Sequence, residues 1–115
     1  MNICVISGEI QKQAVVRGKK TKALAFIVTT THPANNGNGD TEADARISHV
    51  PCVIFSPSED LEHLLTNEGA GKFVELQGRI NGSRFEGPNG QERYNADIVV
   101  FKNTFRILNA SAPQV

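Results

Sequence analysis

Aromatic side chains beside cations are the residues of this chain whose types and spacing could recognise a ligand. Phe85 stands between Arg84 and Glu86 in an otherwise polar stretch. His49 and Phe55 lie six residues apart, so on an extended strand they share a face and are separated by roughly 20 Å. Exposed rings can stack on nucleobases while neighbouring cations contact phosphates. We therefore predict that Phe85, Phe55 and His49 stack on the bases of a nucleic-acid single strand.

The sequence pattern leaves one alternative open for each phenylalanine. Phe85 could instead close the base of a hairpin by packing against Tyr94. Val53 lies between His49 and Phe55 on the same strand face, so burial of Phe55 in the core fits the alternation equally well.

Cations that could contact phosphates fall into two groups. The first group is a basic arm, whose members are Lys12, Arg17, Lys19, Lys20 and Lys22. The second group lies in the later part of the chain and consists of Lys72, Arg79, Arg84 and Arg93. A solvated turn explains any single lysine of the arm better, but together these cations bias the surface toward phosphates.

The distribution of charge supports this prediction more than the total does. The formal net charge is zero, which argues weakly against nucleic-acid binding. Residues 1–39, however, carry five basic side chains and one acidic side chain. Residues 40–75 carry two basic and eight acidic side chains, and residues 76–115 carry five basic and three acidic side chains. The first and last thirds are therefore positive, and a local basic face can attract phosphates.

Patterns for catalysis or metal binding are weak. The glycine-rich stretch 68–73 lacks the first glycine of a phosphate loop, and Phe73 follows Lys72 where Ser or Thr is required. The three histidines have no metal-ligand spacing with one another or with the cysteines. Carboxylates at 59–62 fit helix-dipole complementarity better than acid–base catalysis. We predict no enzyme activity, no catalytic residue, no metal and no other cofactor.

Hydrophobic alternation predicts the strands that must position these side chains. The predicted strands span residues 2–10, 23–31, 46–55, 72–85 and 93–101. Apolar residues on both faces of the first strand favour a strand buried on both sides. Gly87-Pro88-Asn89-Gly90 predicts a hairpin turn between the last two strands. Residues 17–22 are predicted as a basic turn, and residues 32–45 as a long mobile loop or a hairpin tip.

One short helix is predicted over residues 57–67. Ser56-Pro57-Ser58-Glu59 has the spacing of a capping box, with proline at the first helical position. Three leucines then follow at helical spacing, which predicts an apolar face toward a core, and Gly69 supplies a stop.

This order of elements predicts an all-β fold with one short helix, a five-stranded OB-fold Greek-key barrel with the helix between strands 3 and 4. A single domain is expected over residues 1–108, with residues 109–115 as a tail or the start of a linker. Cys4 and Cys52 lie in apolar runs, which predicts buried reduced thiols rather than a disulfide. The absence of a signal sequence and of a long apolar run predicts a cytoplasmic protein with no membrane contact.

Four stretches of the chain resemble bacterial single-stranded DNA-binding proteins. Residues 90–100, GQERYNADIVV, resemble the last strand of that family, and residues 71–80, GKFVELQGRI, resemble its preceding strand. Residues 2–10 and 51–55 are similar to its first and third strands. The resemblance implies an OB-fold that binds single-stranded DNA without sequence preference in replication, recombination or repair, in the bacterial nucleoid or encoded by a plasmid or phage.

The resemblance also implies roles for individual residues. Phe85 falls where the family has a base-stacking tryptophan, Phe55 on a stacking phenylalanine, and His49 on or beside another tryptophan; Arg84 and Arg79 would lie near phosphates. The chain has no tryptophan, so its stacking surfaces would be smaller. It ends in SAPQV without the family's acidic tip, as expected of a shortened chain or a tail-less plasmid or phage branch. Contacts with replication or recombination proteins stay open for that reason.

A tail-less branch of the same family, similar to primosomal replication protein N, implies a different function. Resemblance to that branch implies a dimeric OB-fold module that binds single strands weakly and acts mainly through protein partners at the replication restart machinery. Residues 50–54 fit this branch moderately. The main family implies a homo-tetramer, which we expect first, and the branch implies a dimer, which we expect second.

Overall fold

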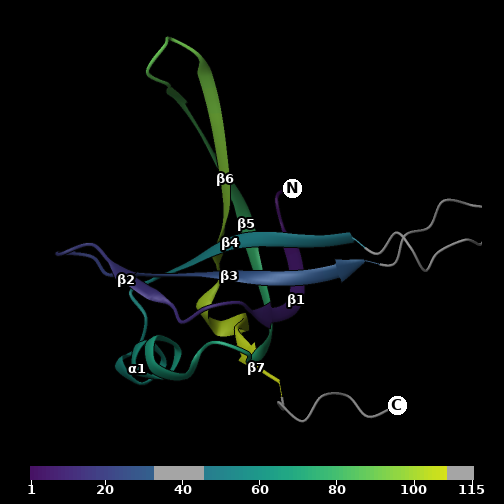
Figure 1. The fold of residues 1–115 in the computed structure, drawn as a ribbon. Helices are drawn as coiled ribbons and strands as arrows, with labels where there is room; N and C mark the ends of the chain where they lie inside the picture. Colours follow the sequence, from purple (N-terminus) through teal and green to yellow (C-terminus); the bar gives the residue numbers. More distant parts are fainter. Residues whose placement is uncertain (33–45, 109–115) are drawn as a thin grey trace, which may run out of the picture.

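The computed structural model describes residues 1–32 and 46–108 and is mostly β, with one α-helix (Figure 1). In chain order the elements are β1 (Cys4–Ile10), β2 (Val15–Arg17), β3 (Ala23–His32), β4 (Arg46–Phe55), α1 (Glu59–Glu68), β5 (Phe73–Glu86), β6 (Glu92–Val100), the 3-10 turn η2 (Lys102–Thr104) and β7 (Arg106–Ile107). The predicted loop over residues 33–45 and the predicted tail over residues 109–115 lie outside the described residues. His32, predicted as the first residue of that loop, ends β3 instead.

Two short strands were absent from the prediction. β2 pairs with β3, so Arg17 belongs to a strand and not to the predicted basic turn, in which Gly18 adopts a φ of 91°. β7 pairs with the beginning of β5. These strands have three and two residues, which is too short for hydrophobic alternation to show in the sequence.

Strand pairing joins the sheet into a closed circuit. β1 pairs antiparallel with β3 and with β5, β3 with β4, and β5 with β6. β4 runs parallel to β6, which completes the circuit β1–β3–β4–β6–β5–β1. Within this circuit, alternate residues of each strand point to the interior and the others point outward.

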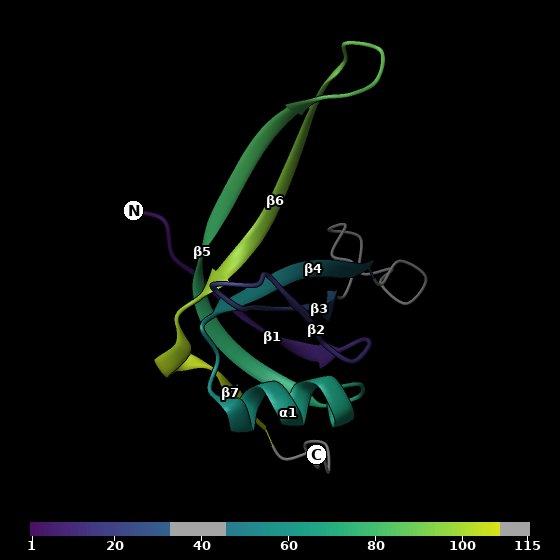
Figure 2. The same cartoon turned by 90° about the vertical axis from the view of Figure 1, so that its left-hand side faces the viewer.

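The core lies on the inner face of the circuit. Alternate residues of β3 and of the first part of β5 point into it. The members from these two strands, each at most 4% exposed, are Leu24, Phe26, Val28, Val74 and Leu76. Leu65 of α1 is fully buried against the same core, and both views place the helix at the end opposite the β5–β6 hairpin (Figures 1 and 2). Each such aliphatic side chain contributes about 1.5–3 kcal/mol of burial free energy.

The first strand is buried on one face only. Ile10 is fully buried, and Cys4 and Ile6 pack partly against the core. Ile3 and Val5 point the other way and are 54% and 68% exposed. The predicted burial on both faces is therefore wrong, because none of the described elements packs over the outer face of β1.

The helix begins two residues later than predicted. Ser58 is the N-cap, since its hydroxyl accepts a hydrogen bond from the backbone N–H of Leu61 at 3.1 Å. Ser56 has a φ of 52°, a left-handed turn that ends β4 and cannot start a right-handed helix. The predicted capping box between Ser56 and Glu59 is therefore wrong, whereas Gly69 does follow the last helical residue as expected.

Beyond the circuit, β5 and β6 continue as a long two-stranded hairpin (Figure 2). Pairing of β5 with β1 stops at Gly78, whereas its pairing with β6 runs on through residues 79–86. A Cβ at Gly78 would collide with the carbonyl oxygen of Val99, so only glycine lets β6 approach this closely. The predicted turn is confirmed: the Gly87 N–H donates to the Gln91 carbonyl at 2.7 Å, and Gly90 has a φ of 78°.

Both cysteines are free thiols, as predicted. Cys4 is half-buried, whereas Cys52 is 1% exposed in the core. Burial, with a smaller contribution from the negative charge of Asp97, raises the pKa of the Cys52 thiol from 9.0 to about 12. The Cys52 side chain therefore stays protonated at neutral pH and behaves as a small apolar group.

Thiol labelling at pH 8 tests this arrangement. Cys4→Ser leaves Cys52 as the sole thiol, and we expect it to resist a water-soluble disulfide reagent until the protein is denatured, because attack requires an exposed thiolate. Cys52→Ala leaves Cys4, which should react in the native protein. Rapid labelling of native Cys4→Ser protein would contradict the burial of Cys52.

Candidate nucleic-acid interface

The β5–β6 hairpin presents two different faces. Directly opposed residues of an antiparallel pair share a face, and the register pairs Phe85 with Arg93 and Arg84 with Tyr94. Phe85 and Arg93 therefore lie together on the face that continues the outer surface of the sheet through Arg79. Phe85 is 44% exposed there, so its predicted outward orientation is confirmed.

The packing of Phe85 against Tyr94, left open by the sequence, is wrong, because the two rings lie on opposite faces of the hairpin. The Tyr94 hydroxyl donates to Glu92 Oε2 at 3.0 Å, and Arg84 Nη1 forms an ion pair with Glu92 Oε1 at 3.4 Å. Arg84 therefore lies on the face away from Phe85, and the cation beside Phe85 is Arg93.

His49 and Phe55 share the outer face of β4. Both are exposed, with Phe55 at 46%, so burial of Phe55 in the core is wrong. Val53 lies between them and is half-buried. The His49 ring is held beside β3, since Nδ1 lies 3.3 Å from the Thr29 hydroxyl oxygen.

A groove of about 310 Å³ crosses the outer face of β3 and β4. Ile27, Pro51 and Val53 of these strands line it with apolar side chains. Lys12 and Arg17, both members of the predicted basic arm, line it from the segment between β1 and β3. Apolar surface beside two cations suits a nucleotide, whose base is flat and weakly polar and whose phosphate is anionic.

A second cavity, of about 290 Å³, adjoins the first. Pro51 and Asp97 line both cavities, and the second is also lined along the hairpin by Ala96 and by the polar residues Asn81, Ser83 and Asn95. These three polar residues lie on the same hairpin face as Phe85. Ser83 and Asn81 stand two and four positions before Phe85 on β5, and Asn95 lies opposite Ser83 on β6. The two cavities and the hairpin face form a continuous surface, which we call the outer-face path.

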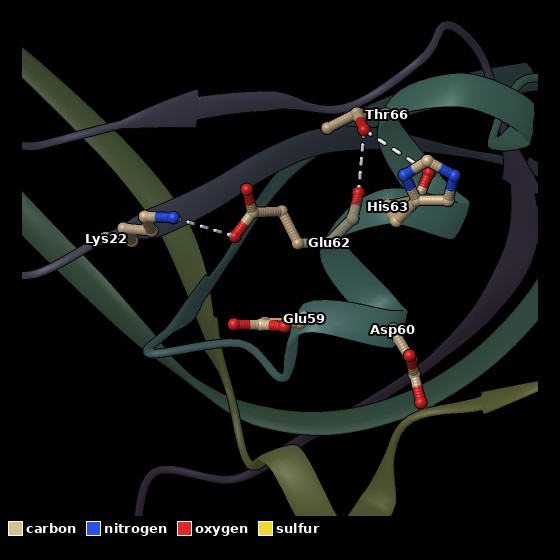
Figure 3. A pocket seen from close by; sticks show the side chains of 6 residues that line it. All are labelled: Lys22, Glu59, Asp60, Glu62, His63 and Thr66. Atoms are coloured by element: carbon tan, nitrogen blue, oxygen red, sulfur yellow. Dashed lines mark hydrogen bonds and ion pairs between the residues drawn. The ribbon is translucent and has the colours of Figure 1, made fainter.

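Four of the predicted cations lie along the outer-face path. They are Lys12, Arg17, Arg79 and Arg93. The structure does not bring Lys22 to it: Lys22 Nζ pairs with Glu62 Oε1 at 3.5 Å in an acidic cavity at the start of α1 (Figure 3). Lys72 precedes β5 at the end remote from the hairpin, and Lys19 and Lys20 lie in the exposed turn between β2 and β3.

Sequence reasoning missed most of the residues that line the path, including the polar residues of the second cavity. Ile27 and Pro51 form part of its apolar surface, and Asp97 lies where the two cavities meet. The signal for Pro51 was present, because it shares strand parity with His49 and Phe55. No sequence signal placed Asp97 there, since its neighbourhood depends on the pairing of β6 with β4.

His49 and His63 each make a side-chain contact within the fold. Besides the His49 contact with Thr29, His63 Nδ1 lies 3.2 Å from the side-chain nitrogen of Asn67. Within residues 1–32 and 46–108, no three His, Cys, Asp or Glu side chains are grouped so that they could hold a metal ion. No helix of this described part is long and apolar enough to cross a membrane.

Comparison with known proteins gives one consistent likeness. No family model matches the chain. Single-stranded DNA-binding protein 3 of Listeria innocua is 28% identical over 102 residues, which is 86% of this chain and 59% of that protein. A single-stranded DNA-binding protein of Oceanobacillus iheyensis is 32% identical over 75 residues, which is 64% of this chain and 42% of that protein. The chain resembles single-stranded DNA-binding proteins.

The solved structures extend this likeness to the fold. A chain of the Plasmodium falciparum SSB complex with ssDNA superposes with a TM-score of 0.73 at 16% identity, covering 95% of this chain and 96% of that one. The resemblance predicted from the four sequence stretches is therefore confirmed. The chain spans about three-fifths or less of the length of the two curated relatives.

Substitution of Phe85 tests whether the exposed ring is a structural plug. We expect Phe85→Ala to change the free energy of unfolding by about 1 kcal/mol or less, because the ring lies outside the core. Phe26→Ala is the matched control: Phe26 is 4% exposed and meets the Phe105 ring edge-on at 5.8 Å, so its loss should cost about 3–5 kcal/mol. Equal losses in denaturant titrations of the two variants would make Phe85 a packing residue.

Proposed function

We propose that this chain binds single-stranded DNA without sequence preference and performs no chemistry on it, with the outer-face path as its binding surface. The observation that carries the proposal is the common face of Phe55, His49, Phe85 and the four cations, joined by two cavities. Stacking on exposed rings requires unpaired bases, which a duplex does not offer. The names of the two curated relatives support the same function.

The dimensions of the path fit an extended strand. The parallel pairing of β4 with β6 places Phe55 near the level of residue 101, and the pairing of β5 with β6 places Phe85 opposite Arg93. The two levels are about eight residues apart, so the two rings are roughly 26 Å apart along the strand direction. Several nucleotides can lie between them. Each stacked base is worth about 1–3 kcal/mol, and each cation that meets a phosphate adds salt-dependent attraction.

The circuit of strands supports a finer description of the fold. We propose that it is the five-stranded OB-fold Greek-key barrel predicted from the sequence, formed by residues 1–108, with α1 over one end. We also propose that the chain self-associates, because Ile3 and Val5 expose apolar surface on the outer face of β1. A tetramer comes first and a dimer second.

Competition binding tests the function. With a labelled single strand as probe, we expect an unlabelled single strand to compete far better than the matched duplex. Phe85→Ala should weaken binding about five- to 150-fold, the effect of losing one stacked base. Phe85→Trp should retain or strengthen binding, because a larger ring stacks better. Equal competition by single strand and duplex would overturn the stacking mechanism.

Two arginines of the hairpin provide a matched pair for the path. Arg93→Ala should weaken binding and reduce the slope of log K against log salt by about 0.7, the share of one phosphate contact on a single strand. Arg84→Ala removes the same charge from the opposite hairpin face and should change both quantities less. A larger effect of Arg84→Ala would place the DNA on the Tyr94 face and contradict the assigned surface.

A further inference from the structure

We propose that Asp97 makes the outer-face path favour bases that carry an exocyclic amino group, which are cytosine, adenine and guanine, over thymine and uracil. The proposal rests on the proposed function, the binding of single-stranded DNA, and refines its lack of sequence preference to a modest preference for one class of base. Asp97 is the one acidic side chain that lines the groove shared by Lys12 and Arg17, among the residues that the structure describes.

Asp97 stands at the junction of the path. It lines the groove over β3 and β4 together with Pro51, and the same two residues line the cavity that leads along the hairpin. It lies on the outer face of β6, opposite Asn81 of β5. A strand that follows the path from the basic arm to Phe85 must therefore pass this carboxylate.

The Asp97 carboxylate is half-buried and has acceptor capacity to spare. None of the side chains or backbone groups described in residues 1–32 and 46–108 donates a hydrogen bond to it or forms an ion pair with it. No buried side-chain oxygen in the described residues lacks a partner, so the Asp97 oxygens are accessible from the groove, and a ligand that lies there can donate a hydrogen bond to them.

Electrostatics decides which part of a nucleotide can supply that donor. A phosphate is repelled by the carboxylate and attracted by Lys12 and Arg17 on the same groove, so the backbone runs beside these cations. The base is then the group that meets Asp97. In a single strand the Watson–Crick edge of the base is free to make this contact.

The edges of the bases differ in what they offer a carboxylate. Cytosine presents its N4 amino group as a donor, and adenine and guanine also carry amino donors. Thymine and uracil present a carbonyl oxygen at the position of the cytosine amino group, and their one donor on this edge, the ring N3–H, lies between two carbonyl oxygens that repel a carboxylate. Cytosine and uracil stack over almost the same area, so a preference between them reports this edge and not the size of the ring.

The direct test compares dC and dU oligonucleotides of the same length, at pH 8, as competitors for a labelled single strand. We expect the wild-type protein to bind the dC strand roughly three- to tenfold more tightly. Asp97→Asn keeps the size of the side chain and adds an amide donor that can serve the uracil carbonyl. For this variant, the ratio of the affinity for the dC strand to the affinity for the dU strand should fall to about one or below. Its affinity for both strands should rise, because the substitution removes a negative charge from the path.

Glu68→Gln is the matched control, because it removes one negative charge from the exposed end of α1, away from both cavities. It should leave the ratio unchanged. A second measurement needs no variant: a dC strand with dimethylated N4 has no donor hydrogens and should lose the advantage over dU on the wild-type protein. This measurement stands even where Asp97→Asn fails to fold.

The outcomes separate the inference from the function beneath it. No binding to any single strand would overturn the proposed function. Tight binding with a dC-to-dU ratio of one, or a ratio that survives both Asp97→Asn and N4 dimethylation, would overturn the role of Asp97 and leave single-strand binding intact.

Discussion

The closure of the strand circuit, made where β5 pairs with β1, is the constraint on which the binding surface depends. Side chains of a strand alternate between its two faces. Because Val74 and Leu76 point into the core, the odd-numbered residues of β5 must point outward. The same rule turns His49 and Phe55 outward when Cys52 and Ile54 are buried. A slip of one residue in either strand would exchange the core with the binding face.

The hairpin shows how this rule persists where there is no core left to enforce it. Pairing with β6 carries the alternation past Gly78, so Phe85 keeps the outward side although its neighbours on both faces are exposed. Glu92 accepts from both Arg84 and Tyr94 on the other face. Exposed ion pairs contribute little to stability, so strand alternation, and not this cluster, sets the face on which Arg84 lies.

Zero net charge is compatible with DNA binding because the charges are sorted by location. Glu59, Asp60 and Glu62 line a separate cavity at the start of α1, where Glu62 also engages Lys22. Lys12 and Arg17 line the groove on β3 and β4 instead. Charges separated by more than about 8–10 Å are largely screened at physiological salt, so the local arrangement governs attraction of phosphates.

Local periodicity and turn chemistry were enough to predict the long strands, the presence of the helix, the hairpin turn and the outward side of Phe85. The sequence also carried the likeness to single-stranded DNA-binding proteins in stretches such as 90–100. The folded structure was needed to show that Phe55 is exposed, that Arg93 and not Arg84 accompanies Phe85, and that Lys22 pairs with Glu62. Those facts, and the place of Asp97, depend on cross-strand register and on contacts between residues far apart in the chain, and neither is written in the pattern of any single segment.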